Sequence, residues 1–127
     1  MPKPLTATIL LLASEPVIRS VICRALESAE YLVLSANDLG SAMDFCARCT
    51  PDVLMVRPYL EDTPGHDAAM YVRNSLPGIP VLIVGGVPDD PGLMDREVLQ
   101  GFQIFPKPFT AAELVAKVRE MLPGIIT

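Results

Sequence analysis

The sequence is poor in the residues that most often build metal and redox sites. Among its 127 residues there are one histidine and three cysteines, and tryptophan is absent. Together these make up the four ligands that a structural zinc site needs, but their spacing does not fit one: Cys46-x-x-Cys49 has no second Cys-x-x-Cys, and the only histidine, His66, is remote in sequence. No run of about 18 consecutive apolar residues occurs either, so the sequence predicts no membrane-spanning helix.

An excess of positive charge is also missing. Ten lysines and arginines stand against 15 aspartates and glutamates, which gives a formal net charge of −5. Nucleic acids and anionic membrane surfaces attract basic proteins, so we expect neither as a partner of this domain. The first residues show no apolar core followed by a cleavage site, and we therefore expect a cytoplasmic protein.

The cysteines offer one candidate for redox chemistry. Cys46 and Cys49 have Cys-x-x-Cys spacing, and Cys23 is the third. The pair falls late in a predicted helix, whereas a reactive thiolate is stabilised at a helix N-terminus. An odd number of cysteines without an export signal favours reduced thiols. A thiol redox protein acting through Cys46 and Cys49 is an alternative that the pattern does not favour.

Short apolar runs alternate along the chain with segments of helical periodicity. The length predicts a single domain spanning 1–127, with its core over about 7–122. Each apolar run is typical of a strand buried on both faces. The strands are expected at 6–12, 32–35, 53–56, 81–84 and 103–105, and the helices at 16–29, 39–50, 66–76, from 91 onward and at 110–122.

Capping signals support several of these helices. Pro16 suits a first helical turn, with Ser14 or Glu15 as its cap. Thr110 and Glu113 have the spacing of a capping box. In the first helix we expect the apolar residues to face the core, with Arg19 on the opposite face. These apolar residues are Val17, Ile18, Val21, Ile22, Ala25, Leu26 and Ala29.

Five strands alternating with five helices predict an α/β, doubly wound parallel sheet with helices on both faces, because parallel strands need crossover connections. Ligand sites in such sheets lie at the carboxyl ends of the strands. Here these ends carry the segments 13–15, 57–58, 85–86 and 106–108. We therefore look for function at these positions.

Four segments around these ends resemble the response-regulator receiver domain of bacterial two-component signalling. They read ILLLASEP at 9–16, PDVLMV at 51–56, PVLIV at 80–84 and KPF at 107–109. The resemblance covers about residues 7–122. It implies a flavodoxin-like fold of five βα units with strand order 2-1-3-4-5, and a role in a phosphorelay.

The resemblance also implies a phosphorylation pocket whose reacting groups are largely replaced here. The family's paired acids, which hold Mg²⁺, correspond to Ala13 and Ser14, next to Glu15. Arg57 stands at the position of the phosphorylated aspartate. The family's hydroxyl residue, switch aromatic and lysine correspond to Gly85, Ile104 and Lys107.

These replacements predict a pocket without phosphoryl chemistry. A guanidinium has no carboxylate oxygen that could accept a phosphoryl group. Together with Lys107, Arg57 would repel a divalent cation. We therefore expect no phosphorylation at this site, no Mg²⁺ or other metal, no cofactor and no enzymatic activity.

Two interpretations of Arg57 are open. In the first, the positive charge of Arg57 takes the place of the metal ion, and the guanidinium pairs with Glu15 or with backbone carbonyls. This pairing would keep the domain in one conformation. Alternatively, the side chain is solvated at a strand end. For Lys107 the alternative to a role in the pocket is that the residue is inherited from the family and has no function in this chain.

The resemblance predicts a pseudo-receiver that works by protein–protein interaction. The family's docking face of fourth helix, fifth strand and fifth helix would meet a sensor kinase, another signalling domain or a second copy of the chain. Residues carried over to this face are Leu93, Arg96, Glu97, Gln103, Lys117 and Arg119. As an alternative function, Arg57 and Lys107 bind a small anion noncovalently. We expect the single histidine, His66, to be exposed.

Overall fold

The computed structural model describes residues 7–61, 63–85, 102–105 and 110–122. From β1 to β4, strands and helices alternate as the sequence predicts. The helix expected from residue 91 onward lies outside the described residues. The elements are β1 (Thr8–Leu12), α1 (Pro16–Ser28), β2 (Leu32–Ala36), α2 (Leu39–Arg48), β3 (Val53–Val56), α3 (Gly65–Ser75), β4 (Val81–Val84), β5 (Gln103–Phe105) and α5 (Ala111–Met121).

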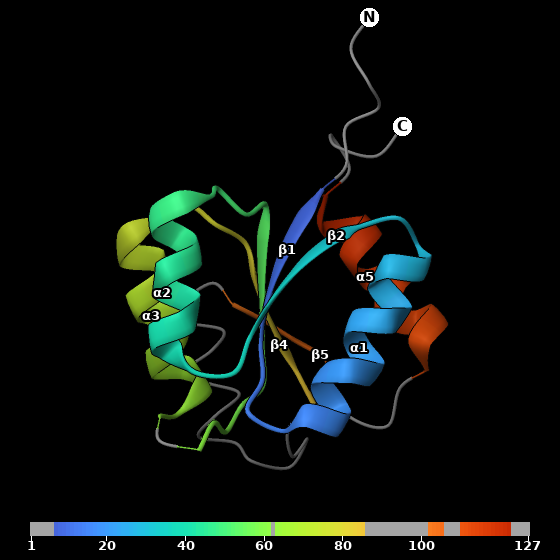
Figure 1. Ribbon diagram of the computed structural model, residues 1–127. Coiled ribbons are helices and arrows are strands. Elements are labelled where there is room, and N and C mark those ends of the chain that lie inside the picture. The colour runs from blue at the N-terminus through green and yellow to red at the C-terminus, as the bar shows by residue number, and fades with distance from the viewer. Residues whose placement is uncertain (1–6, 62, 86–101, 106–109, 123–127) are drawn as a thin grey trace, which may run out of the picture.

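The strands form one parallel five-stranded sheet in the order β2-β1-β3-β4-β5. This order agrees with the one that the family resemblance implies. Figure 1 shows α2 and α3 on one face of the sheet and α1 and α5 on the other. Because β2 is at one end of the order, one of its edges pairs with no other strand among the described residues.

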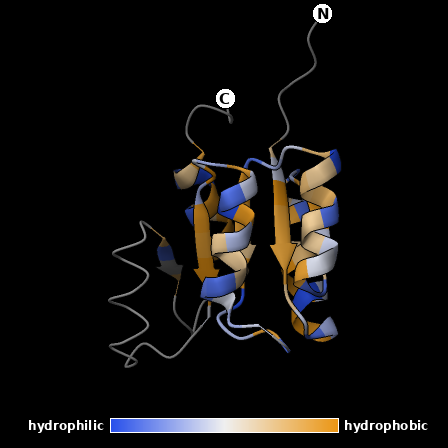
Figure 2. Ribbon diagram, turned by 90° about the vertical axis from the view of Figure 1, so that its left-hand side faces the viewer, coloured by the Kyte–Doolittle hydropathy of each residue, from blue (hydrophilic) through white to orange (hydrophobic). Residues whose placement is uncertain are grey.

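The core consists of two layers, one on each face of the sheet. Successive side chains of a strand point to opposite faces. Leu10 and Leu12 of β1 accordingly join the cluster under α2 and α3, while Ile9 and Leu11 join the cluster under α1 and α5. Burial on both faces explains why the strands are almost wholly apolar, as the orange strands in Figure 2 show.

Helix α1 buries a narrower stripe than its sequence indicates. Ile22 and Leu26 are buried, but Val17 and Val21 are 75% and 62% exposed, which corrects the expectation that both face the core. Each residue of a helix is rotated by about 100° from the previous one, so Val21 lies about a quarter turn away from Ile22. The contact with the sheet is narrower than the apolar arc of the helix.

The predicted capping interaction forms at α5 but not at α1, and α2 has a cap of its own. Thr110 and Glu113 form the predicted capping box at the start of α5. Asp38 caps α2, where its Oδ1 accepts from Ser41 N at 2.8 Å. Glu15 is the N-cap residue of α1, but its side chain makes no capping hydrogen bond. The Glu15 carboxylate is therefore available for another contact.

Among the described residues, no helix combines the length and the apolar character needed to cross a bilayer.

Candidate functional site

The carboxyl ends of β1, β3 and β4 bring together residues from distant parts of the sequence. Leu12 pairs with Val56, and Val56 with Ile83, so the residues that follow these strands are neighbours. We call this location the strand-end site and define it by Ala13, Ser14, Glu15, Arg57 and Gly85. All five were predicted from the sequence to be site residues, and the parallel register places them at one edge of the sheet.

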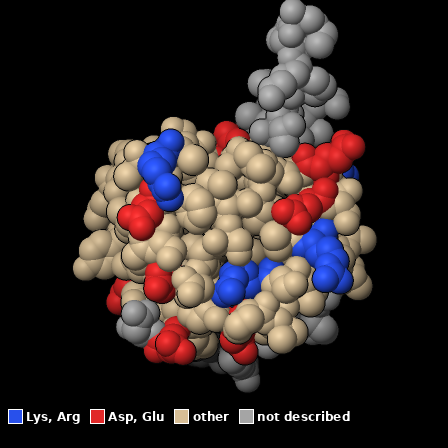
Figure 3. Space-filling model, in the orientation of Figure 1, with Lys and Arg blue, Asp and Glu red and all other residues tan. Residues whose placement is uncertain are grey.

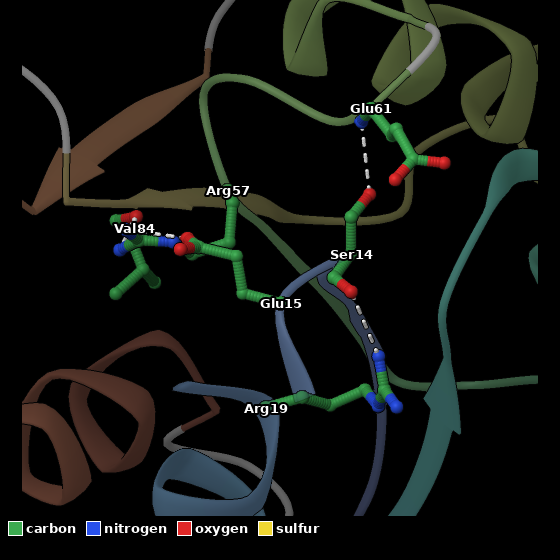
Figure 4. Close-up of polar contacts among 6 residues, drawn as sticks. All are labelled: Ser14, Glu15, Arg19, Arg57, Glu61 and Val84. Carbon is green, nitrogen blue, oxygen red and sulfur yellow. Dashed lines mark hydrogen bonds and ion pairs between the residues drawn. The ribbon is translucent and has the colours of Figure 1, made fainter. Parts of the chain in front are cut away.

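The Arg57 side chain turns inward across the end of β4. The residue is 9% exposed, and Nη1 donates a hydrogen bond of 2.9 Å to the Val84 carbonyl oxygen. Nη2 lies 4.0 Å from Glu15 Oε1, and Figure 4 shows the guanidinium between Val84 and Glu15. The Glu15 side chain is 68% exposed, so water weakens this ion pair and the buried hydrogen bond contributes more. Arg57 therefore has both partners of the pairing interpretation and is not a solvated side chain.

Gly85 provides the space that the guanidinium occupies. Its φ is +87°, in the left-handed region that glycine favours. A Cβ built on Gly85 would collide with Arg57 Nη1 and approach its Cζ. A hydroxyl side chain, as the family resemblance places at this position, and the observed Arg57 conformation therefore exclude each other.

The backbone of Arg57 is held as closely as its side chain. Arg57 N donates to Leu12 O at 3.2 Å, and a Cβ on Gly65 would collide with the Arg57 carbonyl group. Gly65 N in turn donates to Pro58 O at 2.7 Å, which closes the loop after β3. The absence of a side chain at Gly65 thus lets α3 start directly against the end of β3.

Ser14 and Arg19 tie the turn after β1 to its surroundings. Ser14 Oγ accepts a 3.0 Å hydrogen bond from Glu61 N, in the loop after β3. Arg19 Nη1 donates to Ala13 O at 2.7 Å. The same nitrogen donates at 3.4 Å to Ser14 O, the contact that Figure 4 shows. The sequence predicts Arg19 on the outer face of the first helix, but it does not predict these two hydrogen bonds. The long side chain reaches back over the first turn to two carbonyls that precede the helix.

The side chains of this site do not fit Mg²⁺, which the receiver family implies. Mg²⁺ requires a compact set of oxygen ligands, usually including carboxylates. Here Ala13 offers no ligand, Ser14 Oγ already accepts a hydrogen bond, and the Arg57 cation lies between the strand ends. Among the described residues, no group of three or more His, Cys, Asp or Glu side chains is placed to hold a metal ion.

Two predicted site residues are described only in part or not at all. Ile104 lies in β5, where its backbone pairs with Ile83, and its side chain is not described. Lys107 lies outside the described residues, so its place in an anion site with Arg57 stays a prediction. Because the Arg57 guanidinium is buried and bonded to a carbonyl, the described contacts do not favour that alternative.

The expected docking face is also described in part. Gln103 and Arg119 are exposed, and Lys117 Nζ forms a 2.9 Å ion pair with Glu120. The remaining residues assigned to this face, Leu93, Arg96 and Glu97, lie outside the described residues.

The remaining candidates for chemistry are a cysteine pair and a histidine. Cys46 is half-buried and Cys49 exposed, and burial raises the pKa of the Cys46 thiol, the opposite of what a reactive thiolate needs. The His66 side chain is only 11% exposed, so the expectation that it is exposed is wrong. Its ring centroid lies 5.6 Å from that of Phe102, a contact across 36 positions that sequence spacing does not reveal.

Comparisons with known proteins agree with the fold and cover nearly the whole chain. The family model described as response regulator receiver domain matches residues 9–119. The chain is 29% identical over 115 residues to the probable transcriptional regulatory protein TcrX of Mycobacterium tuberculosis, covering 91% of this chain and 49% of that protein. It is 27% identical over 119 residues to the sensor kinase CckA of Brucella abortus, covering 92% of this chain and 13% of that protein. The chain thus spans about half of one relative and a small part of the other.

Solved structures show the same architecture at low sequence identity. The signal receiver domain of an HD domain-containing protein from Pseudomonas fluorescens Pf-5 superposes with a TM-score of 0.84 at 22% identity, covering 97% of this chain and 91% of that one. The chemotaxis protein CheY4 of Vibrio cholerae gives 0.81 at 19% identity, covering 91% and 98%. At these identities the similarity establishes the fold alone.

Proposed function

The chain belongs to the response regulator receiver domain family, and we propose that it is a member that signals by docking to a protein partner without being phosphorylated at its strand-end site. Two-component signalling supplies the context, since one relative is named as a transcriptional regulatory protein and the other as a sensor kinase. We propose a sensor kinase or another signalling domain as the partner. A second copy of the chain is the alternative partner.

The conformation of Arg57 is the observation that carries this proposal. Its buried guanidinium is bonded to the Val84 carbonyl at the place where the family resemblance puts the phosphoryl acceptor. The neighbouring positions hold Ala13 and Ser14 in place of the paired acids. The acceptor position and the paired-acid positions then offer no carboxylate to attack a phosphoryl donor or to bind a metal ion, and the Arg57 cation supplies a positive charge without Mg²⁺.

The same contacts support a single resting conformation. In a switchable module, a ligand or a modification shifts the balance between two states. Here Arg57 links the end of β3 to the end of β4 by a side-chain contact that needs no ligand. We propose that the docking face, which includes Gln103 and Arg119, is therefore presented constitutively.

The test is incubation with acetyl phosphate and Mg²⁺, followed by intact mass measurement. The wild-type chain should keep its mass, and a receiver that retains its aspartate and paired acids, treated in parallel, should gain one phosphoryl group. The variant Arg57→Asp should also stay largely unmodified, because Ala13 and Ser14 provide no carboxylates to bind the metal. A stoichiometric phosphoryl gain by the wild-type chain would overturn the proposal.

A further inference from the structure

A groove of about 410 Å³ runs along one side of α1, next to the open edge strand β2. It is separate from the contact between Arg57 and Val84. Its lining includes Ser20, Cys23 and Glu27 of α1 and Ser35 of β2, with two arginines, Arg19 and Arg24. We call it the α1–β2 groove. Its size falls in the range of small-molecule sites, about 300–1,000 Å³.

The helix places the two arginines on opposite sides of the groove. At about 100° per residue, Ser20, Cys23 and Glu27 lie within an arc of about 60° on α1. Arg19 and Arg24 border this arc from either side, so their side chains flank the same stripe. Figure 3 shows basic side chains gathered on this side of the molecule, over and beside α1.

The two arginines differ in how they are held. Arg19 is anchored through Nη1 to the carbonyl oxygens of Ala13 and Ser14, which leaves its other nitrogens as donors. Arg24 is exposed, and among the residues that the structure describes its side chain has no hydrogen-bonding or ionic partner. A preorganised guanidinium beside an unengaged one is suited to hold an oxyanion with several acceptor atoms.

The local charge also favours an anion. The groove carries the two positive charges of Arg19 and Arg24 and the single negative charge of Glu27. The whole chain, by contrast, has a net charge of −5. Burial and the neighbouring Glu27 carboxylate raise the pKa of Cys23, so this thiol stays neutral and adds no negative charge. The hydroxyl groups of Ser20 and Ser35 supply further donors.

We propose that the α1–β2 groove binds a small metabolite through its phosphate group, with Arg19 and Arg24 as the main contacts. The proposal does not depend on the state of the strand-end site. The two places are nonetheless connected, because Arg19 is bonded to the carbonyls of Ala13 and Ser14, and Ser14 Oγ holds the amide of Glu61. A phosphate bound to Arg19 would alter these hydrogen bonds and so shift the conformation of the strand-end site. Ligand binding would then regulate the domain in place of phosphorylation.

The test is a titration of the ¹⁵N-labelled chain with inorganic pyrophosphate at constant ionic strength, followed by NMR. We expect saturable shifts of the amides of residues 19–24 and 35, and a shift of the Glu61 amide. Arg24→Gln should weaken binding about tenfold, as expected for one charge-assisted hydrogen-bonding group. Arg48→Gln on α2 removes the same charge away from the groove and should bind like the wild type. Ser35→Asp, which places a negative charge in the groove, should weaken binding as Arg24→Gln does.

Three results would overturn the inference. The first is the absence of saturable shifts. The second is equal weakening by Arg24→Gln and Arg48→Gln, which would show a response to net charge alone. The third is loss of binding in Arg57→Gln or Lys107→Gln with normal binding in Arg24→Gln, which would place the anion at the strand ends. None of these results depends on whether the chain can be phosphorylated.

Discussion

Arg57 and Gly85 compete for one volume at the ends of β3 and β4. The guanidinium lies where a side chain of residue 85 would begin, and its hydrogen bond goes to the carbonyl of the residue before it, Val84. A buried cation without such a partner would be costly, so the carbonyl and the missing Cβ are both needed. We therefore expect the effects of substitutions at Arg57 and Gly85 on the free energy of unfolding to be non-additive.

The first prediction concerns Gly85→Ala. The variant should lose about 2 kcal/mol of unfolding free energy, because an L-residue at positive φ costs about 1–2 kcal/mol and the new methyl also displaces the guanidinium. In an Arg57→Ala background the same change should cost about 1 kcal/mol, since only the backbone term remains. Urea denaturation of the four proteins measures both values.

Gly78 offers a matched control for this cycle. It has the same φ of +87°, and a Cβ there would meet no atom within 4 Å. Gly78→Ala therefore carries the backbone strain without the collision. If Gly85→Ala cost no more than Gly78→Ala, or if its cost were the same with and without Arg57, the coupling would be absent.

At the scale of elements, the capping residue of α2 makes stability depend on pH. The Asp38 carboxylate accepts from Ser41 N, and this backbone hydrogen bond lowers the pKa of Asp38 below its usual value. Between the folded and unfolded pKa values, the unfolded chain binds more protons, so stability rises with pH. The contribution is complete above about pH 4, the ordinary aspartate pKa, and disappears as pH falls through the lowered pKa.

The second prediction follows for Asp38→Asn. Asparagine also caps helices well, so the variant should be close to wild type in fold and lose mainly the charge-dependent part of the stability. Its urea midpoint should fall less than that of the wild type between about pH 5 and pH 2. Asp44→Asn, on the exposed side of the same helix, should keep the wild-type dependence on pH. Identical pH profiles for wild type and Asp38→Asn would contradict the assignment.

Helix α1 shows how far periodicity determines an element. The pattern correctly predicts that a helix begins at Pro16, and Ile22 and Leu26 are buried as expected. It does not show that Val17 and Val21 are exposed, because the width of the buried stripe depends on how the helix sits on the sheet. Nor does it show that Arg19 turns back toward the end of β1.

At the scale of the whole molecule, the fold gathers strand ends where a receiver would bind Mg²⁺, but with different charges. Among the described residues of this edge, Arg57 contributes a buried cation and Glu15 a largely exposed carboxylate. Burial strengthens the repulsion between Arg57 and an incoming divalent ion, while solvent weakens the attraction by Glu15.

The third prediction is that Mg²⁺ does not stabilise the protein. A site with a dissociation constant of about 1 mM would add about 1.4 kcal/mol at about 10 mM Mg²⁺. For a chain of 127 residues this corresponds to a rise of roughly 5 °C in the melting temperature. We expect no such rise when MgCl₂ is compared with NaCl at equal ionic strength. A rise of this size that Glu15→Gln abolishes would show that the strand ends bind the metal.

The sequence by itself determined the α/β class, the positions of the strands and the described helices, the capping box of α5 and the chemical types at the strand ends. These properties follow from patterns within a few residues: apolar runs for strands buried on both faces, helical spacing and capping residues. The order of the strands followed from the family resemblance, and the pairing of the strands in the sheet confirms it.

Only the tertiary structure decided which groups meet. Arg57 contacts a carbonyl 27 positions away in a space left by Gly85, His66 packs beside Phe102, and Ser14 binds the amide of Glu61. The physical reason is that such contacts depend on register and packing between strands and helices far apart in the chain. Local residue patterns carry no information about distances across these elements.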